Sequence, residues 1–196
     1  MRRHPKRMKN KRRRKKPSMK RGMAVIAILS GALTALAVLA YGKLGTAWIL
    51  SAAISFGTVF YHFAMRLAVG HTLNALFHNR FDYTRAWFRP RAFEKRLYAT
   101  IGVRRWMGRL PTYSPDTFSR ALHTWEEIAQ ATCQAELVHE CIALLSFLPL
   151  ATIPVFGAPW VFVITSVLAA AFDLLFVCIQ RYNRPMLLRQ IARQQR

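Results

Sequence analysis

Three side chains that could carry out acid–base chemistry lie close together in the sequence. Glu136, His139 and Glu140 are three and four positions apart, so a helix would place all three on one face. A carboxylate next to a histidine orients the ring and makes it more basic, as a general base requires. The spacing therefore predicts that His139 takes the proton from a hydroxyl group and that Glu136 orients it. The alternative is a histidine at a membrane edge that only supports the structure.

A second polar group begins where a long apolar run, residues 159–179, ends. An apolar helix of about 20 residues crosses a bilayer, so these side chains would lie at the edge of the membrane. They are Gln180, Arg181, Tyr182, Asn183 and Arg184, and Pro185 follows them. They could be an aromatic and basic anchor, which is common at the cytoplasmic end of membrane helices. They could also form a substrate-binding site.

As a substrate-binding site, this second group would suit acyl transfer. Moving an acyl group from a thioester to a hydroxyl requires donors that stabilise the developing oxyanion. Arg181, Asn183 or Arg184 could supply these donors, and the arginines could also hold phosphate groups of the acyl donor. Asp173, about two helical turns earlier, is placed in the same site. Pro185 predicts that the helix ends or kinks near Arg184.

The composition indicates an all-α membrane protein with about four transmembrane helices. The chain has 196 residues, of which 53% are hydrophobic, and a formal net charge of +22. This length suits one domain. Four apolar stretches near bilayer length disfavour a soluble nucleic-acid-binding protein. The three cysteines do not indicate a disulfide framework, and the spacing of cysteines and histidines predicts no metal site.

The chain divides into five predicted segments. Residues 1–22 contain thirteen Lys or Arg and no acidic residue, which predicts a disordered arm that is attracted to anionic lipid. Nucleic-acid binding by this arm would be unspecific. The other segments are two transmembrane helices (23–69), a cytoplasmic, interfacial helical region (70–132), two transmembrane helices with the site (133–185) and a basic tail (186–196).

Three features of these segments leave alternatives open. Residues 23–40 could be a cleaved signal peptide, because they contain an Ala-Leu-Ala sequence, although the run is longer than usual. His62 and Arg66 share a helical face and are a functional candidate, unless they only reach toward the wet edge of the membrane. The arginines and aromatics of residues 80–106 suit lipid headgroups or single-stranded nucleic acid.

Glycine and proline positions predict the helices of the middle region. A short helix over residues 91–101 would end at Gly102. A further helix would begin at Ser114 and Pro115, which suit a cap and a first turn. This helix would continue without a break into the third apolar stretch, residues 137–150.

The distribution of charge predicts the topology. Basic residues in the arm, the middle region and the tail alternate with two nearly uncharged turns, so both termini and the middle region would be cytoplasmic. The protein would be a multi-pass protein of the cell membrane. The start of the third membrane helix and the end of the fourth would then lie at the same membrane face, where the group around His139 could meet residues 180–184.

Both polar groups carry a resemblance to a known family. The sequence resembles the glycosyl-4,4'-diaponeurosporenoate acyltransferases at Ala135-Glu136-Leu137-Val138-His139 and at Gln180-Arg181-Tyr182-Asn183-Arg184-Pro185. Asp173, seven residues before the second motif, stands where the family pattern has Asn, and Glu140 stands where it has Trp. Fainter similarity covers residues 93–95 and 103–106.

The resemblance implies a function. It implies a membrane enzyme that transfers a fatty acyl group to the C6 hydroxyl of a sugar on a glycosylated lipid, here a glycosyl carotenoid acid. The co-substrate would be acyl-CoA or another acyl thioester, with no bound cofactor. The partners would be the lipid substrate and, through the arm, an anionic membrane surface, with no specific nucleic acid. The alternative is a non-enzymatic integral membrane protein that serves assembly or lipid binding.

Overall fold

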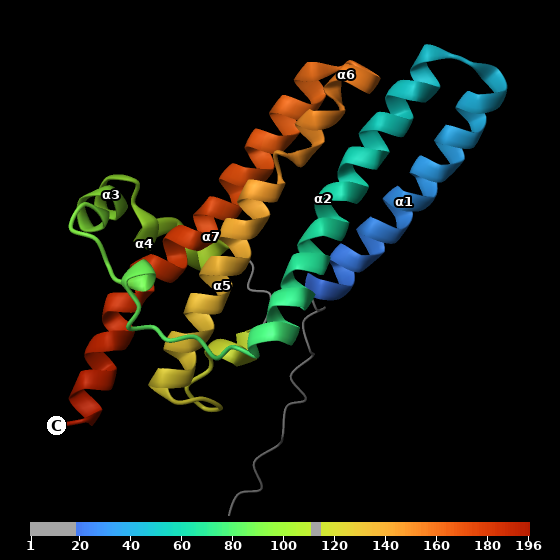
Figure 1. Cartoon of the computed structure of the whole chain (residues 1–196). Coiled ribbons are helices and arrows are strands. Elements are labelled where there is room, and N and C mark those ends of the chain that lie inside the picture. Colours follow the sequence, from blue (N-terminus) through green and yellow to red (C-terminus); the bar gives the residue numbers. More distant parts are fainter. Residues whose placement is uncertain (1–18, 111–114) are drawn as a thin grey trace, which may run out of the picture.

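The protein consists of two long helical hairpins that lie side by side (Figure 1). The computed structural model describes residues 19–110 and 115–196, and this part of the chain is helical with no strand. The first hairpin is α1 (Met19–Leu44) and α2 (Ala47–Phe77), and the second is α5 (Trp125–Leu145) and α7 (Pro159–Gln194). Helix α2 packs against α5 and joins the two hairpins.

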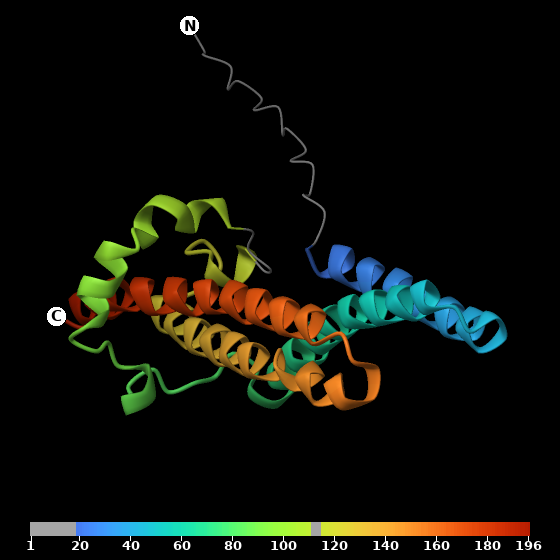
Figure 2. The same cartoon turned by 90° about the horizontal axis from the view of Figure 1, so that it is seen from above.

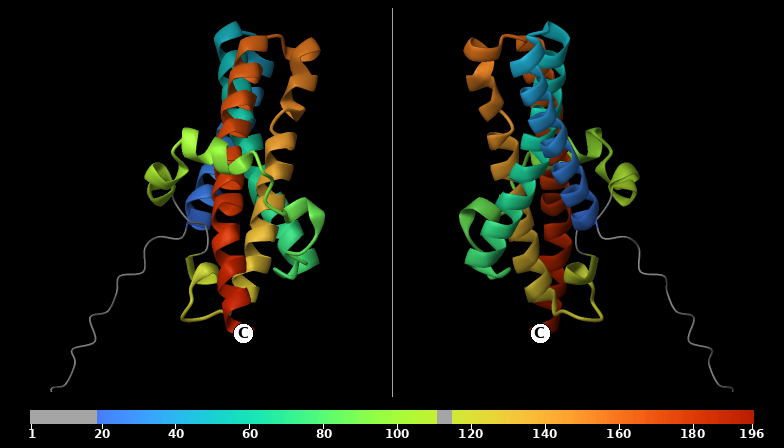
Figure 3. Two further views of the ribbon diagram at one scale, coloured as in Figure 1. Left: turned by 90° about the vertical axis from the view of Figure 1, so that its left-hand side faces the viewer. Right: turned by 90° about the vertical axis from the view of Figure 1, so that its right-hand side faces the viewer.

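The predicted all-α membrane fold is confirmed. Four helical spans are long and apolar enough to cross a membrane: Met19–Leu44, Ala47–Phe77, Trp125–Phe156 and Pro159–Gln194. The third span includes two short helical turns after α5, namely η4 (Leu148–Thr152) and α6 (Ile153–Phe156). The two hairpin turns lie at the same end of the molecule, and the C-terminus lies at the opposite end (Figure 3).

The tight turns have a simple physical cause. Between α1 and α2 the chain reverses at Gly45, which has a φ of 63°, and between α6 and α7 it reverses at Gly157, which has a φ of 66°. Glycine adopts this left-handed region without a steric penalty. Helix α5 begins at a capping box, in which Thr124 and Glu127 each bond the other's backbone N–H.

The middle region wraps around the second hairpin. After α2 the chain forms the short turn η1 (Ala86–Phe88), then α3 (Glu94–Thr100), α4 (Val103–Trp106) and η2 (Met107–Arg109). Both α3 and α4 contact α7, and Figure 2 shows them alongside that helix. The short helix predicted over residues 91–101 is confirmed as α3, which begins three residues later and ends at Thr100, just before Gly102 with its φ of 64°.

Three predicted boundaries are wrong. Helix α2 continues past residue 69 to Phe77, where the Asn74 side chain receives a hydrogen bond from Gln134 on α5. The helix expected to begin at Ser114 begins at Trp125, because the Thr124 capping box is the stronger start signal. Pro115 instead belongs to the short turn η3 (Pro115–Phe118).

The third error is the helix end predicted near Arg184, since α7 continues through Pro185 to Gln194 and includes most of the predicted tail. The proline costs one backbone hydrogen bond, but tertiary packing outweighs it. Leu187 and Ile191, on the next turns, are buried against Ile128 and Ala129 of α5.

Two further predictions fall wholly or partly outside the structure. The polybasic segment 1–22 lies outside the described residues, apart from its last four, which form the first turn of α1. Ser114, the predicted cap, also lies outside them.

Candidate functional site

Charged side chains meet at two levels between α5 and α7. One group, called here the arginine cluster, consists of Glu94, Glu136, Arg181 and Arg184. The other, called the histidine cluster, consists of Arg66, His139 and Asp173. Helices α5 and α7 run in opposite directions. A residue later on α5 therefore faces a residue earlier on α7. This register brings Glu136 to the arginines and His139 to Asp173.

Glu136 is the centre of the arginine cluster. Its side chain is 0% exposed, and its two carboxylate oxygens each lie 2.5 Å from a guanidinium nitrogen, one of Arg181 and one of Arg184. The Arg181 guanidinium also contacts Oε1 of Glu94 from α3, with Nε at 2.8 Å. Burying a charge is costly unless it is paired, and here each buried carboxylate has an arginine. The cluster therefore ties α5, α7 and α3 together.

The same arginines hold the segment before α3 against α7. Arg181 donates hydrogen bonds to the backbone carbonyls of Trp87 and Arg89, each at 3.1 Å. Arg184 donates to the carbonyl of Phe88, also at 3.1 Å. These carbonyls lie in and just after the short turn η1, where regular helix bonds cannot satisfy them all. Both guanidinium groups are thus used to fix the fold around the site.

The histidine cluster has the arrangement of an oriented base. Nδ1 of His139 lies 2.9 Å from Oδ1 of Asp173, and the other carboxylate oxygen lies 2.5 Å from Nη2 of Arg66. The Phe176 ring stacks on the imidazole, with ring centres 4.6 Å apart and planes 10° from parallel. Asp173 is 2% exposed, whereas the His139 side chain is 23% exposed.

This geometry determines which nitrogen of His139 can react. A buried carboxylate next to Nδ1 holds the proton on that nitrogen and leaves the lone pair on Nε2. Within residues 19–110 and 115–196, no side chain or backbone group hydrogen-bonds to Nε2 of His139. The ring, which is partly exposed as a whole, therefore carries its lone pair on a nitrogen without a hydrogen-bond partner in the described residues, in a direction fixed by Asp173 and Phe176.

The predicted partner of His139 is corrected by these contacts. Glu136 does not orient the ring, because both of its carboxylate oxygens face Arg181 and Arg184. Asp173, predicted as a substrate-binding residue, is the carboxylate beside His139. The spacing on α5 places Glu136 and His139 on one face, but the register against α7 gives them different partners.

Arg66 belongs to the histidine cluster, because its guanidinium is paired with Asp173. Besides Asp173 it contacts the carbonyls of His62, at 2.9 Å, and Ala169, at 3.4 Å. His62 lies one turn before it and is buried, and neither of its ring nitrogens has a hydrogen-bond partner in the described part of the chain. These contacts turn the Arg66 side chain toward α7 and favour its place in the site over the alternative in which it only reaches toward the edge.

The other predicted substrate-binding residues lie in the C-terminal half of α7. Tyr182 contacts Tyr98 edge to face, with ring centres 6.2 Å apart. Gln180 and Asn183 are half-buried, and no hydrogen bond from either side chain is found among the described residues. The oxyanion role of Arg181, Asn183 or Arg184 stays a prediction, and the two arginines already bind carboxylates.

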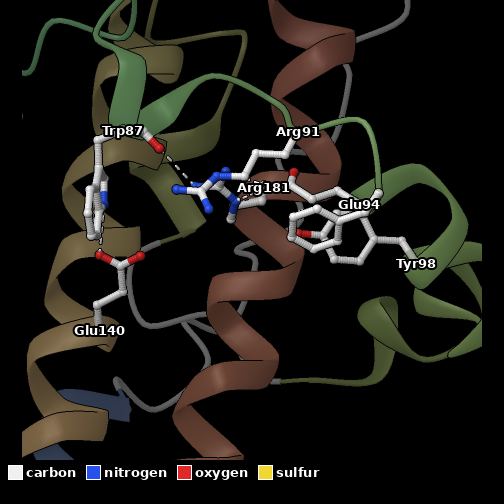
Figure 4. Close-up of a pocket in the computed structure, with 7 residues that line it drawn as sticks. Trp87, Arg91, Glu94, Tyr98, Glu140 and Arg181 are labelled. Carbon is white, nitrogen blue, oxygen red and sulfur yellow. Dashed lines mark hydrogen bonds and ion pairs between the residues drawn. The ribbon is translucent and has the colours of Figure 1, made fainter.

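An open cavity of about 260 Å³ lies beside the arginine cluster (Figure 4). Its lining residues come from the segment before α3, from α3, and from the facing sides of α5 and α7: Trp87, Arg91, Phe93, Glu94, Tyr98, Glu140 and Arg181. Nε1 of Trp87 donates a hydrogen bond to Glu140, at 3.1 Å. Burial raises the pKa of the Tyr98 phenol to about 12, so this hydroxyl is neutral at physiological pH.

Sequence reasoning missed Glu94 and Trp87 as parts of this region. Glu94 appeared only as a fainter point of resemblance, and Trp87 as one aromatic among many. The one available signal was a carboxylate in a strongly basic segment, since a buried arginine needs such a partner. The sequence does not show which arginine that is.

Comparison with known proteins gives the family of the chain. No curated protein and no solved structure matches the chain. The family model described as glycosyl-4,4'-diaponeurosporenoate acyltransferase matches residues 84–193, more than half of the 196 residues. The matched part contains the arginine cluster and the His139–Asp173 pair, and its name is that of an acyltransferase of carotenoid glycolipid biosynthesis. The chain therefore belongs to the glycosyl-4,4'-diaponeurosporenoate acyltransferase family.

Proposed function

We propose that this protein transfers a fatty acyl group from a thioester to a sugar hydroxyl of a glycosylated lipid in the membrane. The acceptor is a glycosyl carotenoid acid of the kind that the family name describes. The observation that carries the proposal is the pair of His139 and Asp173, in which one ring nitrogen is held by a buried carboxylate and the other is free. Acyl transfer to an alcohol needs such a base.

The proposed reaction begins with the acceptor hydroxyl next to Nε2 of His139. As the hydroxyl oxygen attacks the thioester carbonyl carbon, Nε2 takes its proton and the ring becomes an imidazolium. The C–S bond then breaks, and the leaving thiolate takes the proton back from Nε2. The products are an ester and a free thiol. A positioned base of this kind contributes about 10²–10⁴-fold to the rate.

Asp173 and Arg66 are the positioning residues of this step. Asp173 keeps the proton on Nδ1 and lies beside the ring when the ring carries its positive charge. Arg66 neutralises the carboxylate in a region where an unpaired charge would be expensive. The first hairpin takes part in the site through Arg66. This hairpin lies outside residues 84–193, the segment that matches the family.

The depth of the site suits two amphipathic substrates. Asp173 lies eight positions before Arg181 on α7, which is about 12 Å deeper at ~1.5 Å per residue. We place the arginine cluster at the cytoplasmic edge of the membrane, with both termini on that side, because the basic segments flank it. The base then lies just inside the bilayer, where a glycolipid headgroup and an acyl thioester can meet.

Replacing His139 tests the proposal. We expect His139→Ala to insert normally and to lower the formation of acylated glycolipid by about 100-fold or more, the usual effect of losing a general base. The matched control is His71→Ala, since His71 is an exposed histidine on α2. Lipid mass spectrometry of membranes with equal protein levels gives the result. A fully active His139→Ala protein would exclude this function for the ring.

A further inference from the structure

One of the residues that line the cavity, Glu140, is the chain neighbour of the proposed base. Glu140 follows His139 directly on α5, and it stands one turn above Glu136 on the same helix face. Across the cavity is Arg181, which on α7 is nearer to the C-terminus than Asp173. With the arginine cluster at the membrane edge, as proposed above, the Arg181 wall of the cavity faces the level at which the headgroup of a lipid would lie.

We infer that this cavity binds the sugar ring of the acceptor glycolipid, with Glu140 and Trp87 as the residues that select for the sugar. The inference rests on the proposed function, because it names the subsite for the group that is acylated. A sugar presents C–H groups on the faces of its ring and hydroxyl groups around the edge. A site for it therefore needs an exposed aromatic ring together with hydrogen-bonding groups that point inward.

The lining of the cavity meets this requirement. Trp87 and Phe93, which both line the cavity, are each 57% exposed, although large apolar side chains normally gain from burial. Figure 4 shows Trp87 and Glu140 on one side of Arg181, with Glu94 and Tyr98 on the other. Hydroxyl groups that entered between them would meet carboxylate oxygens on two sides.

Glu140 has a carboxylate oxygen that is free to accept hydrogen bonds in the described part of the cavity. Trp87 supplies a single hydrogen bond to Oε2 of Glu140, and no arginine or lysine pairs with this carboxylate in the described residues. Glu94 is already engaged by Arg181, through two guanidinium nitrogens. A carboxylate with a free oxygen accepts hydrogen bonds from neighbouring hydroxyls, and such charge-assisted bonds are about twice as strong as neutral ones.

The size of the cavity favours a single ring over an acyl chain. Its volume of about 260 Å³ is just below the roughly 300–1,000 Å³ of pockets for drug-sized ligands. Its walls mix carboxylates and arginines with aromatic rings, which a fatty acyl chain would not need. Arg91, which is exposed at the rim and forms no ion pair in the described part of the chain, is a further donor for a sugar oxygen.

A binding measurement without the acyl donor tests the inference directly. The full-length protein in lipid nanodiscs is titrated with glycosyl-4,4'-diaponeurosporenoate and, separately, with the same carotenoid acid lacking the sugar. We expect the glycosylated lipid to bind at least tenfold more tightly, and we expect Glu140→Gln to remove most of this preference. The loss of one charged hydrogen bond corresponds to about tenfold in affinity. Glu126→Gln, which makes the same change on α5 outside the cavity, should leave the preference intact.

Kinetic measurements then separate this inference from the proposed function. With saturating acyl thioester, Glu140→Gln and Trp87→Leu should each raise the KM for the glycosyl lipid and leave the KM for the thioester unchanged. If the wild-type protein transfers acyl groups but Glu140→Gln keeps the sugar preference, the sugar subsite is wrong and the function stands. If the protein binds the sugar through Glu140 but acylates nothing, the function is wrong and the subsite stands. Equal binding of both lipids by the wild-type protein overturns the subsite.

Discussion

Nδ1 of His139 lies 2.9 Å from Oδ1 of Asp173, although the two residues are 34 positions apart and on different helices. Each residue is also held independently of the other. Phe176 stacks on the imidazole ring, and Arg66 contacts the second carboxylate oxygen. A side chain fixed from two sides loses little freedom when a substrate arrives, and catalysis depends on such preorganisation.

Replacing the carboxylate of Asp173 by an amide should show how much of the rate depends on the negative charge of this side chain and how much on its shape. Asp173→Asn keeps a group of the same size next to Nδ1 but removes the negative charge that balances an imidazolium. The corresponding change in serine proteases costs about 10⁴-fold in kcat, so we expect a loss of about 10²–10⁴-fold here with a smaller change in KM. Rates in nanodiscs measure this, and Asp116→Asn, an exposed aspartate on η3, is the control. A loss of less than threefold would contradict the positioning role of Asp173.

Neutralising Arg66 together with Asp173 should restore stability without restoring activity. Arg66→Gln alone leaves a buried carboxylate without its cation, which costs about 3–5 kcal/mol. The double variant Arg66→Gln, Asp173→Asn buries no unpaired charge at this point, so its Tm in detergent should lie well above that of Arg66→Gln. Its acyl-transfer rate should remain as low as that of Asp173→Asn. Additive losses of stability in the double variant would show that the two side chains do not interact.

The four membrane helices could be predicted because apolar length is a local property of the sequence. The residues around each apolar run also predicted that His139 and residues 180–184 come from neighbouring parts of the third and fourth spans, as the contacts between α5 and α7 show. The partners of these side chains depend on the register between α5 and α7, which no single helix encodes. The i, i+3, i+4 spacing therefore paired His139 with Glu136, whereas the register pairs it with Asp173.

Tertiary contacts also explain one further error and one alternative that the sequence left open. The helix end predicted near Arg184 is overridden because Leu187 and Ile191 gain more from packing on α5 than the helix loses at one proline. The role of Arg66 was left open because its distance from the end of an apolar run does not show which way α2 faces. The rotation of α2 against α7 decides this, and it turns Arg66 toward Asp173.

Tyr98 should give the protein a characteristic response at high pH. Burial raises its pKa to about 12 in the folded protein, above the value of about 10 for an exposed phenol. The unfolded chain therefore loses this proton first, so stability falls as the pH rises from about 10 to about 12. We expect Tyr98→Phe to reduce this part of the decline in Tm, whereas Tyr41→Phe, at the exposed end of α1, should not. Identical pH profiles for Tyr98→Phe and the wild type would contradict the burial of the phenol.

Glu136 should prove to be a structural residue and not a catalytic one. Its carboxylate is fully buried between Arg181 and Arg184, and Glu136→Gln would leave two arginines with one neutral partner. Removing one member of such a buried group costs about 3–5 kcal/mol, so we expect a large drop in Tm, while Glu126→Gln on the same helix stays near the wild type. The rate per folded molecule, measured well below the lowered Tm, should stay within a few fold of the wild type because the His139–Asp173 pair is untouched. A variant with a normal Tm and no activity would instead return Glu136 to the reacting centre.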